Sequence, residues 1–252
     1  MSDLQLRIHS SPASRGSPAQ GLRAGLAGLL CGLALHAVAE PAPAVDEPYG
    51  LCGHLHNVGQ YGPYDYRKDL DKLPIVLGAH FTPEVESLTR GRTSGTPGGD
   101  IDYTLRAIPN NPRALVAMVR LGEKEKTQQP AGAKYIVECY LERGIRFAPD
   151  DQIARMIYAS FLIKANRFPE AAAQLGVAQQ LDENNPFTQY NLGLLYFEMK
   201  DYDKALAQAQ RSYAQGMRQP DLRDKLTAVG HWVEPAAESA SSPASAASGA
   251  PP

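Results

Sequence analysis

The sequence predicts an all-α fold built from antiparallel pairs of helices. From Asp100 to about Gly230 the apolar residues recur with helical spacing, and no stretch shows the sustained period-two alternation of a half-buried strand. Pro and Gly interrupt this helical pattern at intervals. The third observation is an internal repeat, because residues 152–185 fall on residues 186–219 with matched chemistry when shifted by 34. A period of 34 residues is typical of arrays of helix pairs.

The repeat is visible residue by residue. The matched positions are Tyr158 with Leu192, Ala159 with Gly193, Leu162 with Tyr196, Phe168 with Tyr202 and Ala171 with Ala205. Two helices of a pair approach closely only where a side chain is small, so Gly193 and Ala205 are the expected points of contact. Asp201 is placed to cap the second helix of the last pair.

The segment "NLGLLYFEMKDYDKALAQA" resembles the tetratricopeptide repeat family, with its large apolar residue, small residue, aromatic residue and later alanine-like positions. The resemblance implies a solenoid of about three units, closed by a capping helix at 220–232. An altered first unit spans about 108–149, with "GEKEKTQQPAGA" as a lengthened loop between its helices. Residues 100–109 look like the second helix of a still earlier, degenerate unit, with 82–91 as its first.

The amino terminus predicts export. Three arginines precede the apolar run "AGLAGLLCGLAL", and the small residues Ala37 and Ala39 follow it, as in a secretory signal peptide cleaved after Ala39. The run has about twelve residues where a bilayer needs about twenty, so we expect no integral membrane span in the mature chain. A lipoprotein signal at Cys31 is the alternative, disfavoured by Leu30 before it. The expected location is periplasmic.

The remaining boundaries follow from composition. Residues 1–39 form the signal peptide, 40–48 a Pro-rich linker, and 49–99 an irregular segment rich in Gly, Pro and aromatic residues with one short helix at 82–91. The helical repeat domain covers 100–232. Residues 233–252 form an Ala/Ser/Pro tail with almost no large apolar residue, and we expect this tail to be disordered.

The net charge limits the class of partner, and the cysteine count indicates the compartment. Without residues 1–39 the chain carries 22 Lys and Arg against 26 Asp and Glu, a balance that disfavours nucleic acid as a partner. Cys52 and Cys139 remain, and in an oxidising compartment we expect them to form a disulfide. Such a bond closes a loop of 87 residues, worth about 4 kcal/mol in the chain-entropy model. Two separate buried thiols are the alternative.

The resemblance also implies where a partner binds. In this family the first helices of successive units line a groove that holds a peptide or a helix of another protein. By register the groove residues here are Ile153, Met156, Ser160 and Ile163 in one unit and Phe187, Tyr190, Asn191, Leu194 and Phe197 in the next. Tyr190 and Phe197 are expected at its centre. The alternative is that the chain's own residues 49–99 fill the groove.

Candidate chemistry is thin by comparison. "CGHLH" places Cys52, His54 and His56 at alternate positions, and a strand would bring them to one face as the start of a metal site. Alternate spacing is a weak signal and Cys52 is better used in a disulfide, so a loop with solvent-facing imidazoles is favoured and no metal site is expected. "AHFTPEVE" sets His80 near Glu84 and Glu86, yet no recognisable nucleophile motif accompanies them. The segment "YGPYDYRKD" at 61–69 is either a docking surface or packing for an irregular segment.

The hypothesis from sequence is an exported scaffold or assembly factor that binds another protein. It is not expected to be an enzyme, and no phosphate-binding or dinucleotide-binding motif calls for a cofactor. Two alternatives stay open. One is a small enzyme or metal-binding segment at 52–86 carried by a structural repeat domain, and the other is a self-assembling envelope component.

Overall fold

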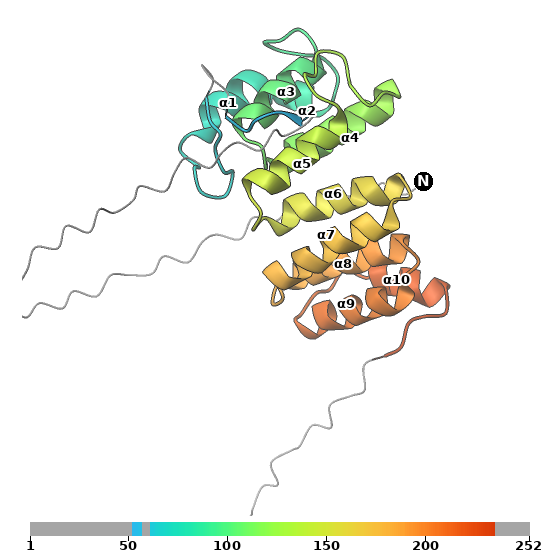
Figure 1. The fold of residues 1–252 in the computed structure, drawn as a ribbon. Coiled ribbons are helices and arrows are strands. Elements are labelled where there is room, and N and C mark those ends of the chain that lie inside the picture. Colours follow the sequence, from blue (N-terminus) through green and yellow to red (C-terminus); the bar gives the residue numbers. More distant parts are fainter. Residues whose placement is uncertain (1–51, 57–60, 235–252) are drawn as a thin grey trace, which may run out of the picture. The chain divides into compact units, whose positions relative to one another are not determined.

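The computed structural model describes residues 52–56 and 61–234 (Figure 1). In this part of the chain every regular element is a helix, so the predicted all-α class is confirmed. None of the helices in these ranges is both long and apolar enough to cross a membrane. The signal peptide, the Pro-rich linker and nearly all of the predicted tail lie outside the described residues.

The chain divides into two compact units, with the boundary between Phe147 and Ala148. The described part of the first unit contains α1 (Leu73–His80), α2 (Pro83–Glu86), α3 (Pro97–Ala107), α4 (Pro112–Glu125) and α5 (Val137–Phe147). Helix α3 packs against α1, α2 and α4, and α4 packs against α5. The centre of this unit is made by fully buried apolar side chains: Ile101, Leu105, Ile108, Leu115, Met118, Leu121 and Leu141.

Proline and a capping residue start the two central helices of this unit. Thr96 precedes Pro97, and its hydroxyl oxygen accepts a hydrogen bond from the Gly99 amide at 3.1 Å. Asn111 precedes Pro112, and its side-chain oxygen accepts from the Ala114 amide at 3.1 Å. Both pairs satisfy an otherwise unpaired donor of the first turn. The long connection expected within the first repeat unit is present between α4 and α5.

The structure corrects two expectations for residues 49–99. The helix expected at 82–91 is only α2, Pro83–Glu86, because the chain turns sharply at Leu88, whose φ is +59°. Helix α1 was not anticipated. It exists because Leu73 and Val76 bury their side chains in a cluster with Ala107 and Ile108. No local sequence pattern indicates this contact.

The second unit contains α6 (Gln152–Lys164), α7 (Phe168–Leu181), α8 (Pro186–Glu198), α9 (Tyr202–Ala214) and α10 (Asp221–Ala228). Helices α6 and α7 pack along each other, as do α8 and α9, and α6 also touches α8. The two pairs begin 34 residues apart, at 152 and 186, as the sequence repeat predicted. Helix α10 packs against both α8 and α9, at the place expected for a closing helix.

The turn inside each pair repeats with the same period. Asn166 and Lys200 both adopt the left-handed conformation, with φ of +58° and +61°. One residue later, the Arg167 amide donates to the Leu162 carbonyl and the Asp201 amide to the Tyr196 carbonyl. The repeat therefore extends from side-chain chemistry to the backbone geometry of the turn.

Candidate functional site

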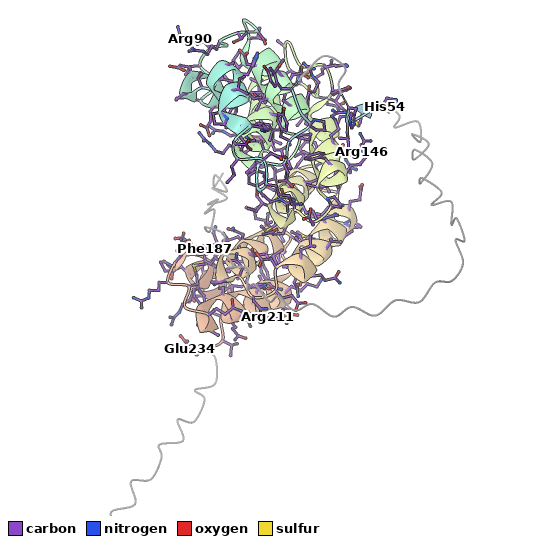
Figure 2. All side chains as sticks on the ribbon, turned by 90° about the vertical axis from the view of Figure 1, so that its left-hand side faces the viewer. His54, Arg90, Arg146, Phe187, Arg211 and Glu234 are labelled. Atoms are coloured by element: carbon purple, nitrogen blue, oxygen red, sulfur yellow. A yellow bond between two sulfur atoms is a disulfide. The ribbon has the colours of Figure 1, made fainter. Side chains whose placement is uncertain are left out.

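The side of α8 that the sequence assigned to partner binding is partly open to solvent. Phe187 is 38% exposed, and Asn191, Leu194 and Phe197 are each partly exposed. Their spacing places these four residues along one side of the helix, and we call this set the α8 face. Figure 2 shows Phe187 at the edge of the second unit. Leu192 and Leu195, which lie away from this side of α8, are fully buried.

Tyr190, expected at the centre of an accessible groove, is not part of the α8 face. Only 4% of the residue is exposed, and its hydroxyl points to Asp221 Oδ2 of α10 at 3.5 Å. Burial, reinforced by the negative charge of Asp221, raises the pKa of Tyr190 to about 12. The expectation fails because α10 covers this position, so Tyr190 belongs to the α8–α10 packing.

The α6 residues assigned to the groove also divide. Ile153 and Ser160 are partly exposed, whereas Met156 and Ile163 keep 1% and 7% of their surface. Met156 and Ile163 are therefore core residues, contrary to expectation. Helix α6 carries apolar side chains around most of its circumference, so spacing does not single out the side that faces water.

Charged side chains from three helices frame the carboxyl end of the α8 face. Glu198 ends α8, and burial by its neighbours raises the pKa of its carboxyl although the residue keeps contact with solvent. The cations Lys164 of α6 and Lys225 of α10 act against that rise. The Lys225 ammonium also lies 5.6 Å from the centre of the Phe197 ring. This end of the face is a polar rim next to an aromatic surface.

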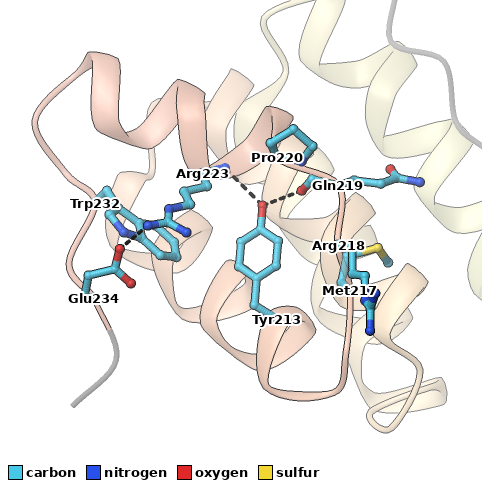
Figure 3. Close-up of a pocket in the computed structure, with 8 residues that line it drawn as sticks. All are labelled: Tyr213, Met217, Arg218, Gln219, Pro220, Arg223, Trp232 and Glu234. Atoms are coloured by element: carbon cyan, nitrogen blue, oxygen red, sulfur yellow. Dashed lines mark hydrogen bonds and ion pairs between the residues drawn. The ribbon is translucent and has the colours of Figure 1, made fainter. Parts of the chain in front are cut away.

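A pocket lies at the carboxyl end of the described chain (Figure 3). It has a volume of about 400 Å³, within the range of small-ligand cavities. We call it the C-terminal pocket, and its lining residues are Tyr213, Met217, Arg218, Gln219, Pro220, Arg223, Trp232 and Glu234. The sequence did not predict it.

The pocket forms because the chain reverses after α10. Gly230 adopts a φ of +73°, and the amides of His231 and Trp232 both donate to the Leu226 carbonyl, at 2.8 and 3.2 Å. The indole of Trp232 then meets Tyr213 edge-on, with ring centres 5.8 Å apart. The expected capping helix at 220–232 ends at Ala228 instead, and the lone Trp after a glycine was the sequence signal for this turn.

Arg223 contacts both the carboxylate of Glu234 and the aromatic wall of the pocket. Its guanidinium lies 5.2 Å from the Trp232 ring centre and forms an ion pair with Glu234. The Tyr213 hydroxyl donates to the Gln219 carbonyl at 2.8 Å and accepts from the Arg223 amide at 3.1 Å. Since the hydroxyl is engaged in this way, Tyr213 offers mainly its ring to the cavity.

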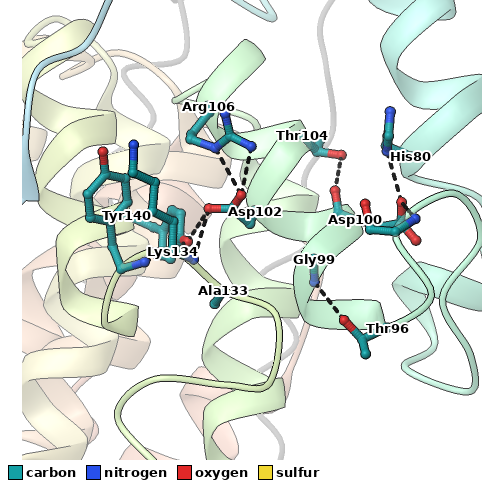
Figure 4. Close-up of polar contacts among 12 residues, drawn as sticks. His80, Thr96, Gly99, Asp100, Asp102, Thr104, Arg106, Ala133, Lys134 and Tyr140 are labelled. Carbon is teal, nitrogen blue, oxygen red and sulfur yellow. Dashed lines mark hydrogen bonds and ion pairs between the residues drawn. The ribbon is translucent and has the colours of Figure 1, made fainter. Parts of the chain in front are cut away.

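In the first unit the structure regroups the residues of "AHFTPEVE" (Figure 4). His80 Nδ1 lies 2.8 Å from Asp100 Oδ1, and the imidazole stacks on Tyr103 with ring centres 3.9 Å apart. Glu86 instead forms an ion pair with Arg113. His80 and Glu86 are therefore engaged with different partners, and Asp100 is the partner of His80 that sequence reasoning missed.

Asp100 organises the loop before α3. The carboxylate is fully buried and accepts the amide protons of Arg92, Thr93 and Ser94. Burial acts to raise its pKa, but the hydrogen bonds from this loop and from His80 outweigh it and hold the pKa below its usual value. The His80–Asp100 pair thus anchors a loop.

A second buried acid, Asp102, holds the α3–α5 region together. The Tyr140 hydroxyl of α5 donates to Asp102 Oδ1, and Arg106 Nε donates to Asp102 Oδ2 at 2.9 Å. Burial first, and then the negative charge of Asp102, raise the pKa of Tyr140 well above its usual value. We read this network as structural, because it locks α5 to α3 through satisfied polar contacts.

Cys52 and Cys139 form a disulfide in the structure, as predicted. Arg143 Nη1 donates to the carbonyl oxygens of Cys52 and His54, and Arg146 Nη2 donates to that of Gly53. Figure 2 shows His54 and Arg146 in the same region of the first unit. The "CGHLH" segment is thereby tied to α5 through its sulfur and its backbone.

The metal hypothesis for this segment loses one of its three ligands to that bond. Within residues 52–56 and 61–234, the one group of three side chains with ligand spacing is Cys52, Cys139 and Glu142. The two sulfurs of this group are bonded to each other. A metal binds the thiolate form of cysteine, which a disulfide does not provide.

Comparisons with protein-family models, with curated proteins and with solved structures find no match to this chain. The α8 face, the C-terminal pocket and the pattern of the sequence are therefore the features from which function is inferred.

Proposed function

We propose that this chain is an exported protein of the tetratricopeptide repeat type, located in the periplasm, that binds a peptide or a helix of another protein as a scaffold or assembly factor. The observation that carries the proposal is the α8 face. Phe187, a large aromatic residue, keeps 38% of its surface in water on a regular helix whose other side is packed.

The chemistry of the α8 face suits a protein partner. Partly exposed aromatic and apolar residues next to a polar rim are typical of interaction sites, where a few aromatic anchors carry most of the binding free energy. Phe187 and Phe197 are such anchors, and Leu194 lies between them. Glu198 and Lys225 at the rim supply charges that fix the register of a bound segment.

Asn191 adds a directional contact. Its side-chain amide has both donor and acceptor groups, as has the backbone of a bound peptide. The position is partly exposed between Phe187 and Leu194, so an amide there can reach a ligand that lies along α8. Export is supported by the amino-terminal sequence and by the disulfide, which is typical of oxidising compartments.

Site-directed cross-linking tests this proposal. A photoreactive residue at Leu194, with a control at the exposed Ala207 of α9, should capture a partner at the first position only. Tyr190 is unsuitable for this purpose because it is buried. The captured protein is then purified, and its binding is measured by calorimetry.

Two substitutions complete the test. Phe187→Ala and Leu194→Ala should each weaken binding of the purified partner about tenfold, as for an anchor worth about 1.4 kcal/mol. The circular dichroism melt should stay close to that of the wild type, since both side chains reach solvent. Unchanged binding by both variants would exclude the α8 face as the site.

A further inference from the structure

The C-terminal pocket offers a binding function that is separate from the α8 face, since the two share no residue. We propose that this pocket binds a short segment of another polypeptide in which a carboxylate side chain lies beside an apolar side chain. Arg223 receives the carboxylate, and the aromatic wall receives the apolar group.

Charge is the first argument. The pocket rim carries two guanidinium groups, Arg218 and Arg223, against one carboxylate, Glu234. Asp221 and Asp224 of α10 also act on Tyr213, so the surroundings of the pocket carry no net positive charge, and contact with an anion depends on the two guanidinium groups themselves. A guanidinium group at the rim offers an anionic ligand group a directly complementary charge.

The geometry of Arg223 is the second argument. A guanidinium is planar, stacks on aromatic rings and binds carboxylates through a fork of donors. Arg223 already stacks on a ring and pairs with a carboxylate, because its guanidinium lies over Trp232 and its Nη2 contacts Glu234 Oε1. The pair with the chain's own Glu234 therefore shows that Arg223 can bind a carboxylate in its present position.

The pair with Glu234 is readily exchanged for a partner's carboxylate. The two side chains are 51% and 62% exposed, and ion pairs at such exposed positions contribute little to stability. Glu234 follows Val233, whose carbonyl accepts a hydrogen bond from Gln210 at 2.9 Å. An incoming carboxylate can thus replace that of Glu234 while the backbone of this segment stays bound to α9.

The walls of the C-terminal pocket suit an apolar side chain next to the ligand's carboxylate. Tyr213 presents its ring between Arg223 and Arg218, while Trp232 lies beside Arg223 and Met217 beside Arg218. Aromatic walls of this kind, with a few directional polar groups, are typical of sites that bury most of a small ligand. An acidic residue flanked by leucine fits both halves of this surface.

The chain contains one tryptophan, so its fluorescence reports on this pocket. The probe is the peptide acetyl-Ala-Leu-Glu-Leu-Ala-amide, titrated into the full chain, beside the same peptide with Gln in place of Glu. We expect a saturable change in Trp232 emission with the acidic peptide. The Gln peptide should bind at least about tenfold more weakly.

Variants of the chain assign the roles. Arg223→Gln and Arg218→Gln should each weaken binding of the acidic peptide, whereas Glu234→Gln should tighten it several-fold because the internal competitor is lost. Arg211→Gln, exposed on α9 outside the pocket, is the matched control and should leave the titration unchanged. Near-ultraviolet circular dichroism of Trp232 confirms that each variant keeps its fold, and Arg218→Gln carries the test if Arg223→Gln does not.

Four results would overturn the proposal. They are equal binding of the Glu and Gln peptides, no saturable response, an equal response to sodium acetate, which would mean an adventitious ion only, and no effect of either arginine substitution. A synthetic peptide of residues 235–252 that binds more tightly than the acidic probe would show that the site serves this chain itself, which also contradicts a foreign partner. Phe187→Ala should leave the titration unchanged, so failure here is separable from failure of the α8 face.

Discussion

Gly193 of α8 lies directly beneath Leu222 of α10. A β-carbon built on Gly193 would come within 2.5 Å of Leu222 Cδ2 and within 3.3 Å of the Ala205 carbonyl oxygen. Leu222 is fully buried, so its methyl group can move aside only by changing its other packing contacts. The small residue expected at the α8–α9 contact therefore also makes room for α10.

Substitution of this glycine should destabilise the second unit. Overpacking costs about 1–3 kcal/mol, and the higher helix propensity of Ala returns about 1 kcal/mol, so Gly193→Ala should lower the free energy of unfolding by about 1 kcal/mol. Urea unfolding followed by Trp232 fluorescence measures this change.

Gly176 of α7 is the matched control. A β-carbon there meets no heavy atom within 4 Å, so Gly176→Ala should raise the free energy of unfolding by about 0.5–1 kcal/mol. Effects of the same sign at both glycines would show that Gly193 does not set the distance between α8 and α10.

The burial of Tyr190 leads to a second prediction. Tyr190→Ala should lower the free energy of unfolding by about 3–5 kcal/mol, as for a large aromatic residue removed from a core. Phe187→Ala, three residues earlier and 38% exposed, should cost less than about 1 kcal/mol. Urea unfolding of the two variants makes the comparison, and a similar loss in both would contradict the burial of Tyr190 under α10.

These residues show what the sequence could and could not predict. The 34-residue period predicted the pairing of α6 with α7 and of α8 with α9, and Asp201 caps α9 as expected, because helix starts and pair spacing are local properties. The burial of Tyr190 is not a local property. It depends on where α10 packs. The groove residues were assigned from the repeat register alone, without the contacts of the expected capping helix.

Other elements escaped prediction for the same reason. Helix α1 is defined by two buried side chains, Leu73 and Val76, and by contacts with α3 rather than by periodicity. The C-terminal pocket depends on the left-handed turn at Gly230, which returns Trp232 to Tyr213. By contrast, the Cys52–Cys139 bond followed from compartment and cysteine count, which are global properties of the chain.

Removal of this disulfide should affect the first unit alone, since both cysteines lie in it. The double variant Cys52→Ser, Cys139→Ser should lower the stability of that unit by about 4–5 kcal/mol, as the chain-entropy model gives for a loop of 87 residues. Hydrogen exchange should show faster exchange in peptides from α3 to α5 and unchanged exchange in peptides from α8 and α9. Equal acceleration in both units would contradict this confinement.

The hydrogen bonds of Asp100 predict an acid-sensitive first unit. Its pKa is lower in the folded chain than the usual value of about 3.9, so the ionised form contributes stability that is complete above that value. This contribution is lost as the pH falls through the folded pKa. Asp100→Asn removes one acceptor oxygen for the amides of Arg92, Thr93 and Ser94 and should cost about 1–3 kcal/mol near pH 7.

The difference between wild type and Asp100→Asn should therefore narrow in acid. Thermal unfolding followed by far-ultraviolet circular dichroism at about pH 7, 4 and 2.5 measures it. Asp203→Asn, at an exposed position of α9, is the control and should behave as the wild type at each pH. A difference that stays constant from neutral to acid pH would mean that protonation of Asp100 does not weaken the loop at 92–94, which would contradict a stabilising role for its negative charge.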